Sequence, residues 1–195
     1  MKVIGITGGI GTGKSTVLNI LQQYYDAYIV ETDKLAHHLM SPGQSAYNEI
    51  VEYFGAEIIC EDTTIDRSKL GQIVFHNKEK LHRLNEIVHP AVKEYIINDI
   101  VKKRQEQKVT YYIIEAALLI EDGYKSICDE MWYIYSSQET RLKRLLADRG
   151  GNEEKWIQVM KNQATETFYR DNCDVMIDNS YNVEKTMETI KGLLC

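Results

Sequence analysis

The chain has 195 residues, a net charge of −6, 44% hydrophobic residues and 27% charged residues. This composition is typical of one soluble domain with a substantial core, and the acidic balance argues against non-specific nucleic-acid binding, which needs a basic face. With only two prolines and no apolar run long enough to span a bilayer, we expect neither a disordered tail nor a membrane protein.

The N-terminal segment predicts a strand, a glycine-rich loop and a helix, in that order. Lys2–Thr7 is apolar and rich in β-branched residues, as a buried strand requires. Residues 15–25 carry apolar side chains at helical spacing. Between them, residues 8–15 read GGIGTGKS and match the phosphate-binding pattern G-x-x-x-x-G-K-[ST].

Each fixed residue of this P-loop has a physical role in binding a nucleoside triphosphate. Glycine permits backbone conformations that are closed to other residues, so that successive N–H groups can approach the phosphate oxygens. The helix that follows adds its positive N-terminal partial charge. We expect Lys14 to reach the β- and γ-phosphates of ATP and the Ser15 hydroxyl to bind the cofactor Mg²⁺. The predicted nucleotide-binding residues of the loop are Gly9, Gly11, Thr12, Gly13, Lys14, Ser15 and Thr16.

Four further segments have the near-continuous apolar character of strands that are buried on both faces. They are residues 28–32, 110–115, 131–135 and 175–177. Their alternation with helical patterns predicts an α/β fold, with a parallel five-stranded sheet of the P-loop NTPase type flanked by helices, in a single domain over residues 1–195. Ligands of such sheets bind beyond the carboxyl ends of the strands.

Two segments differ from this alternation. Residues 41–107 have helical patterns without a convincing buried strand, which predicts a helical insertion. We expect Asp66 and Asn77 to cap two of its helices, and Pro90 to occupy the first turn of another. Residues 138–167 are helical and rich in cations, which predicts a lid or, alternatively, a solvated helix face.

Acidic residues follow the second and third predicted strands at the expected binding edge. The carboxylate of Asp33 can accept a proton from a substrate hydroxyl or help to hold Mg²⁺, or it can cap the helix expected over residues 34–39. Glu115 ends the third strand, and Glu121 lies six residues later. Either can hold the water shell of a metal or be a surface residue, so these alternatives stay open.

The cysteines indicate a reducing environment. The four cysteines form no C-x-x-C pair and lack metal-ligand spacing, and a chain of this size does not need disulfides to fold. We therefore interpret all four as free thiols: Cys60, Cys128, Cys173 and Cys195. Glycines interrupt the N-terminal apolar stretch too early for a signal peptide, so we expect a cytoplasmic protein. The sequence does not indicate an oligomeric state.

The order of these motifs resembles the dephospho-CoA kinase family. The resemblance covers nearly the whole chain and includes Asp33 after the second strand. It rests further on ITGGIGTGKST at 6–16, DRSKL at 66–70, IVF at 73–75, HP at 89–90, LLIE at 118–121, ETRLKR at 139–144, Gln163 and DVMIDN at 174–179. An ordered series of this kind is far more specific than a P-loop alone.

The resemblance implies an ATP-dependent kinase. Such an enzyme transfers the γ-phosphate of ATP to the 3′-hydroxyl of the ribose of dephospho-CoA, the last step of coenzyme A synthesis. The resemblance implies that Asp33 is the base for that hydroxyl, with Lys14 as the second catalytic residue. It also implies that residues 41–107 bind the acceptor and that residues 138–167 are the lid.

Arginines of the expected lid are candidates for stabilising the charge on the transferred phosphate. By the same resemblance, Arg144 and Arg149 are candidate ATP ligands, and Arg141 is a further candidate. The Arg-Asp pair of the family appears here in the reversed order, as Asp148-Arg149.

Two alternative functions remain compatible with the motifs. One is another small-molecule or nucleoside kinase on the same scaffold. The other is a non-catalytic nucleotide-binding regulator, although the sequence has no obvious N-K-x-D motif for reading guanine.

Overall fold

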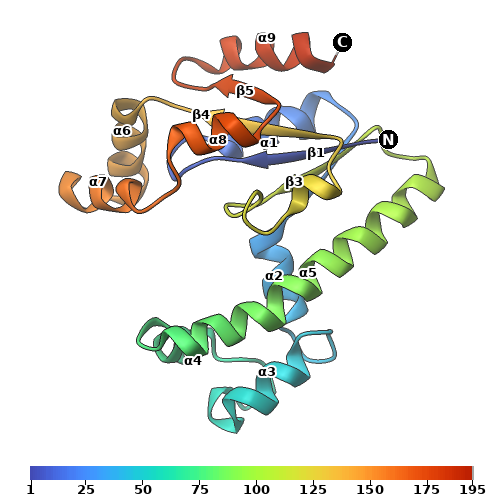
Figure 1. Ribbon diagram of the computed structural model, residues 1–195, viewed down its shortest axis with the longest axis vertical. Coiled ribbons are helices and arrows are strands. Elements are labelled where there is room, and N and C mark those ends of the chain that lie inside the picture. The colour runs from blue at the N-terminus through green and yellow to red at the C-terminus, as the bar shows by residue number, and fades with distance from the viewer. Residues whose placement is uncertain (195) are drawn as a thin grey trace. The chain divides into compact units, whose positions relative to one another are not determined.

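A parallel five-stranded sheet is the centre of the fold in the computed structural model, which describes residues 1–194 (Figure 1). The prediction for Cys195 lies outside the described residues. The strands are β1 (Lys2–Thr7), β2 (Ala27–Glu31), β3 (Tyr111–Glu115), β4 (Glu130–Tyr135) and β5 (Val175–Asp178). Their order is β2-β3-β1-β4-β5, and β1 pairs in parallel with both β3 and β4. The predicted sheet is confirmed, with strand ends displaced by one residue at most.

Helices occupy most of the remaining described chain. They are α1 (Lys14–Tyr24), α2 (Thr32–Leu39), α3 (Tyr47–Phe54), α4 (Arg67–Phe75), α5 (Lys78–Glu106), α6 (Gln138–Arg149), α7 (Glu153–Lys161), α8 (Glu166–Asn172) and α9 (Val183–Leu194). Two short 3₁₀ turns span Ala56–Ile58 and Tyr124–Ser126. Within residues 1–194, no helix is both long and apolar enough to cross a membrane.

The main hydrophobic core lies between the sheet and the helices α1 and α9. Alternate residues of the strands face these helices, because successive side chains of a strand point to opposite faces. Burying a side chain of this size contributes roughly 1.5–3 kcal/mol, so the core fixes α1 firmly on the sheet. The buried members are Ile4, Ile6, Val17, Leu18, Ile20, Leu21, Ile113, Trp132, Ile134, Ile177 and Ile190.

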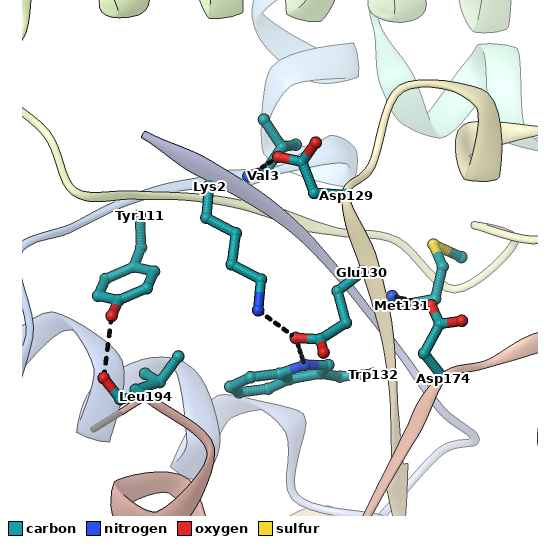
Figure 2. Close-up of polar contacts among 9 residues, drawn as sticks. All are labelled: Lys2, Val3, Tyr111, Asp129, Glu130, Met131, Trp132, Asp174 and Leu194. Carbon is teal, nitrogen blue, oxygen red and sulfur yellow. Dashed lines mark hydrogen bonds and ion pairs between the residues drawn. The ribbon is translucent and has the colours of Figure 1, made fainter.

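Aspartates pair with the backbone of the second residue of a neighbouring strand at the amino edge of the sheet (Figure 2). Asp129, which precedes β4, accepts a hydrogen bond of 2.7 Å from the N–H of Val3 and donates its own N–H to the Val3 carbonyl at 2.8 Å. Asp174, which precedes β5, forms the same reciprocal pair with Met131, at 2.8 and 2.9 Å. These pairs fix the register in which adjacent strands begin.

Further polar contacts extend along this amino edge. Asp26, which precedes β2, accepts 2.9 Å hydrogen bonds from both the N–H and the hydroxyl of Thr110, next to β3. Lys2 lies 2.9 Å from the carboxylate of Glu130, which also accepts a 2.8 Å hydrogen bond from the indole of Trp132 (Figure 2). The amino edge is therefore closed by side chains of the protein itself.

The chain divides into two compact units. One comprises Met1–Val30 with Glu106–Cys195, and the other comprises Glu31–Gln105. After Glu31, the last residue of β2, the regular elements of the second unit are helices, apart from a single isolated bridge between Ile59 and Ile65 among its described residues. This agrees with the expectation of helices without a buried strand in residues 41–107.

Both predicted caps of the helical unit are confirmed. Asp66 accepts two 3.0 Å hydrogen bonds from backbone N–H groups in the first turn of α4. Asn77 accepts one of 3.0 Å from the backbone of Lys80 at the start of α5. Each side chain satisfies N–H groups that the helix itself leaves unpaired.

The predicted helix start at Pro90 is wrong. Pro90 lies inside α5, which runs without interruption over 29 residues. An internal proline removes one helical hydrogen bond and costs about 3 kcal/mol. The helix continues because buried apolar residues flank the proline on both sides and their packing offsets that cost. These residues are Ile87, Val88, Val92, Ile96 and Ile100.

Candidate active site

Residues 8–16 form the predicted P-loop between the end of β1 and the start of α1. Gly11 and Gly13 have φ angles of 76° and 83°, a left-handed conformation that other residues rarely adopt. The buried hydroxyl of Thr12 donates a 2.9 Å hydrogen bond to the carbonyl of Gly9, which closes the turn. The glycines are therefore needed for the shape of the loop.

Several N–H groups of the loop have no protein acceptor. Among residues 1–194, nothing accepts a hydrogen bond from the backbone N–H of Gly11, Gly13, Lys14 or Ser15. Gly13 is the N-cap of α1, and no side chain caps this helix. Unpaired N–H groups and the positive end of a helix dipole together favour an anion with several oxygens, such as a phosphate chain.

Lys14 lies beside the loop between a carbonyl and a carboxylate. Its ammonium donates a 2.9 Å hydrogen bond to the carbonyl of Gly8 and lies 3.5 Å from Oε1 of Glu115. Both side chains are largely buried, at 18% and 14% exposed. Glu115 ends β3, the strand next to β1, so the sheet itself places this carboxylate at the P-loop. Glu121, the other candidate after this strand, is exposed.

The carbonyl oxygen of Thr12 accepts hydrogen bonds from three separate elements. The hydroxyl of Ser136, just after β4, lies 3.0 Å away, and Nη1 of Arg144, on α6, lies 3.2 Å away. The amide Nδ2 of Asn179, just after β5, is 2.9 Å away. A Cβ on Gly13 would lie only 2.2 Å from this amide nitrogen, so Asn179 also packs directly against the loop.

Arg144 faces the P-loop and not the solvent. Its Nη1 also lies 3.1 Å from the hydroxyl of Ser136, and its Nη2 donates a 2.8 Å hydrogen bond to the carbonyl of Asn179. A planar guanidinium can make several such bonds at once, which suits it to joining three loops. The alternative of a solvated helix face is therefore wrong for Arg144.

Arg141 and Gln163 hold the peptide groups on either side of Ile10. Nε of Arg141 donates to the carbonyl of Ile10 at 2.7 Å, and Nη2 donates to Oε1 of Gln163 at 2.8 Å. The same Gln163 oxygen accepts the N–H of Ile10 at 2.9 Å. Burial lowers the pKa of the Arg141 guanidinium, an effect that the neighbouring Tyr133 and Tyr169 oppose. The solvated-face alternative is wrong for Arg141 as well.

The side chains of two predicted site residues make no polar contact with other described residues. Asp33 is exposed in the first turn of α2, within the unit Glu31–Gln105. It does not cap this helix, so that alternative is wrong, and its carboxylate has no hydrogen bond or ion pair among the described residues. Arg149 ends α6, is exposed and likewise has no such partner in residues 1–194.

No sequence pattern indicates a role for Ser136, and Asn179 is indicated only by the family resemblance. Both directly follow a strand, at the carboxyl ends of β4 and β5. The rule that selected Asp33 and Glu115 would therefore have found them, had it been applied to small uncharged residues as well. Their buried polar groups support the P-loop instead of facing a ligand.

Comparisons with known proteins identify the family and the fold. The family model described as dephospho-CoA kinase matches residues 2–185. A dephospho-CoA kinase of Carboxydothermus hydrogenoformans is 39% identical over 194 residues, covering 100% of this chain and 93% of that protein. A Thermus thermophilus crystal structure is similar with a TM-score of 0.80 and 25% identity, covering 99% and 96% of the two chains. The dephospho-CoA kinase structure from Campylobacter jejuni has a TM-score of 0.73 at 24% identity, covers 99% and 98%, and supports the fold.

Proposed function

The chain belongs to the dephospho-CoA kinase family, and on that premise we propose that it phosphorylates dephospho-CoA with ATP. The γ-phosphorus–oxygen bond of ATP breaks, a new bond forms to the ribose 3′-oxygen, and ADP and coenzyme A are released. The observation that carries this proposal is the family match across a chain whose P-loop has N–H groups without an acceptor in residues 1–194. This reaction is the last step of coenzyme A synthesis.

The P-loop and Lys14 are the proposed binding site for the triphosphate. The N–H groups of Gly11, Gly13 and Ser15 donate to phosphate oxygens, while the Lys14 ammonium contacts the β- and γ-phosphates. Lys14 already lies against the Gly8 carbonyl, at the rim of the loop. Little rearrangement is therefore required before it can reach a phosphate.

The residues at the start of α1 fit Mg²⁺. The hydroxyl of Ser15 is exposed and has no hydrogen bond among the described residues, and the carboxylate of Glu115 lies close to neighbouring Lys14. Mg²⁺ prefers such oxygen donors and takes only one or two from the protein alongside phosphate oxygens. When bound, the ion neutralises charge on the β- and γ-phosphates. Ser15 would bind it directly, and Glu115 would hold its water shell.

Asp33 is the proposed general base. Its carboxylate is exposed and unpaired among the described residues, so it is available to accept the proton of the ribose hydroxyl. The helical residues 41–107, in the same part of the chain, are the proposed acceptor-binding insertion. Residues 138–167 are the proposed lid, which excludes water so that ATP is not simply hydrolysed.

The lid arginines divide into two proposed roles. The guanidinium groups of Arg141 and Arg144 are engaged with P-loop carbonyls, so they act first by holding the loop. Arg149 has no protein partner among the described residues, which leaves it available to contact the nucleotide. We also propose a cytoplasmic location, since the three described cysteines are free thiols.

The decisive experiment is to identify the product. The protein is incubated with Mg-ATP and dephospho-CoA, and coenzyme A is sought by mass spectrometry. Release of ADP with a panel of nucleosides, nucleotides and sugars, but not with dephospho-CoA, would instead establish another kinase on this scaffold. Tight ATP binding with no acceptor-stimulated turnover would identify a non-catalytic regulator.

Asp33→Asn tests the general base. We expect kcat to fall about 10²- to 10⁴-fold with the affinity for ATP nearly unchanged, because the amide cannot accept the proton. The control is Glu31→Gln, which changes a nearby carboxylate that is paired with Lys34 at 2.7 Å. It should alter kcat by less than about twofold. Normal turnover by Asp33→Asn would exclude the catalytic role.

A further inference from the structure

A buried amide connects the P-loop to the last helix of the described chain. Asn179 is 1% exposed, and its Nδ2 lies 2.9 Å from the carbonyl of Thr12 and 3.3 Å from that of Gly13. At the other end of the amide, Oδ1 accepts a 2.8 Å hydrogen bond from the hydroxyl of Thr186 on α9. Thr186 is fully buried.

The surroundings of Asn179 determine which way its amide points. An amide has two donors on nitrogen and only acceptors on oxygen. The carbonyls of Thr12 and Gly13 accept the amide N–H groups and would repel the amide oxygen, so the nitrogen faces the loop and the oxygen faces Thr186. The Thr186 hydroxyl supplies the donor for that oxygen, which would otherwise be a buried acceptor without a partner.

The two carbonyls that Asn179 contacts belong to the peptides that carry key N–H groups. A trans peptide is planar, and its C=O and N–H bonds point in opposite directions. Holding the Thr12 carbonyl therefore directs the N–H of Gly13 to the other side, and holding the Gly13 carbonyl does the same for the N–H of Lys14. Both N–H groups lack a protein acceptor among residues 1–194.

We propose that Thr186 is a positioning residue of the nucleotide site. It holds the amide of Asn179 in the one orientation that directs the N–H groups of Gly13 and Lys14 toward the phosphates. Without the hydroxyl, Oδ1 loses this donor and becomes a buried acceptor without it, so the amide is held less firmly against the Thr12 and Gly13 carbonyls. The role rests on the proposed binding of ATP at this loop.

The test compares substitutions at Thr186 with one on the outer side of the same helix. Thr186→Val keeps the shape and removes the hydroxyl, whereas Thr186→Ser keeps the hydroxyl. Thr189→Val is the matched control, because the exposed Thr189 hydroxyl bonds only within α9, to the Lys185 carbonyl at 3.0 Å. Dissociation constants for ATP are measured by direct titration, and KM and kcat are measured for both substrates.

We expect Thr186→Val to weaken ATP binding and raise KM for ATP about tenfold, as loss of one buried hydrogen bond predicts. KM for dephospho-CoA should change by less than about twofold. Thr186→Ser and Thr189→Val should both bind ATP as the unmodified protein does. A merely structural role would instead lower the active fraction and leave both KM values of the remaining enzyme unchanged.

Three results would overturn the proposal. They are unchanged ATP affinity in Thr186→Val, equal loss in Thr186→Ser, and equal increases in KM for both substrates. If Thr186→Val does not fold, Thr186→Cys is measured instead, because a thiol is only a weak hydrogen-bond donor. We expect its ATP affinity to be lower than that of the unmodified protein and of Thr186→Ser, but not completely lost. The titration needs no turnover. Failure to form coenzyme A would therefore contradict the proposed function without deciding the role of Thr186.

Discussion

At the amino edge of the sheet, the N–H groups of Val3 and Met131 are paired with the carboxylates of Asp129 and Asp174. At the carboxyl edge, residues of the P-loop such as Gly13 present the same chemical group without a protein acceptor in residues 1–194. Both edges belong to one compact unit and share β1. The difference shows that carboxylates satisfy N–H groups at the amino edge of β1 and β4, whereas P-loop N–H groups such as that of Gly13 have no such carboxylate in residues 1–194 and remain available to an anion.

Carbonyl groups of the P-loop, unlike the N–H group of Gly13, have partners among the described residues. At the carboxyl edge, side chains donate hydrogen bonds to the loop's carbonyl oxygens. Lys14 donates to Gly8, Arg141 to Ile10, and Arg144 to Thr12. With the carbonyls already satisfied, the loop presents mainly donors to a ligand. Cationic side chains therefore contribute twice, by their charge and by removing competing acceptors from the site.

The largest expected effect comes from replacing the lysine at the carboxyl edge, compared with replacing a lysine at the amino edge. Lys14→Ala should reduce kcat/KM for ATP at least 10²- to 10³-fold, because it removes a charge that stabilises the phosphates in the transition state. Lys2→Ala is the matched control, since Lys2 forms a half-exposed ion pair with Glu130 at the amino edge. It should change stability by about 0–1 kcal/mol and leave turnover unchanged. Full activity of Lys14→Ala would refute the P-loop interpretation.

An intermediate effect is expected at the aspartates of the amino edge. Asp129→Ala leaves the N–H of buried Val3 without its acceptor and should lower the free energy of unfolding by about 1–2 kcal/mol. Asp129→Asn retains an acceptor oxygen and should cost less. Both variants should keep KM for ATP, because the P-loop lies at the opposite edge. Urea unfolding and steady-state kinetics test this, and a changed KM would show that the edges are coupled.

The smallest effect is confined to alkaline pH. Burial raises the pKa of the Cys128 thiol, next to the amino edge, to about 12. The folded pKa lies above the unfolded value, so this contribution to stability is complete below about pH 9 and is lost as the pH rises toward 12. The free energy of unfolding should decrease as the pH rises above about 9. In Cys128→Ala this decrease should be smaller, by up to about 1.4 kcal/mol per pH unit. Urea unfolding at pH 8, 9 and 10 checks it, with Cys60→Ala, an exposed thiol, as the control. Identical slopes in the unmodified protein and Cys128→Ala would contradict it.

The elements that depend on local patterns were predictable. Lys2–Thr7 matches β1 residue for residue, because a buried strand leaves an apolar run in the sequence. The P-loop was predictable because its glycines and Lys14 are adjacent in the chain. Caps such as Asp66 were predictable because the bonded atoms lie within three residues.

Contacts between distant segments were not predictable from these patterns. The bonds from Ser136 and Asn179 to Thr12 join residues 124 and 167 positions apart. Nothing in the local sequence of a small polar residue distinguishes such a partner from an ordinary turn residue. The predicted helix start at Pro90 is wrong for a related reason. The packing of the residues around Pro90, and not the preference of proline itself, decides that α5 continues.

The bond between Thr12 and Asn179 also has a consequence for synthesis of the protein. Residues 8–16 are synthesised early, but Asn179 is synthesised 167 residues after Thr12, and Thr186 follows it. At about 5–20 residues per second, this delay is roughly 8–30 s. During that time the loop lacks the side chains that aim its N–H groups. A nascent chain therefore cannot assemble a complete nucleotide site until nearly all of this sequence has been translated, which couples activity to completion of the fold.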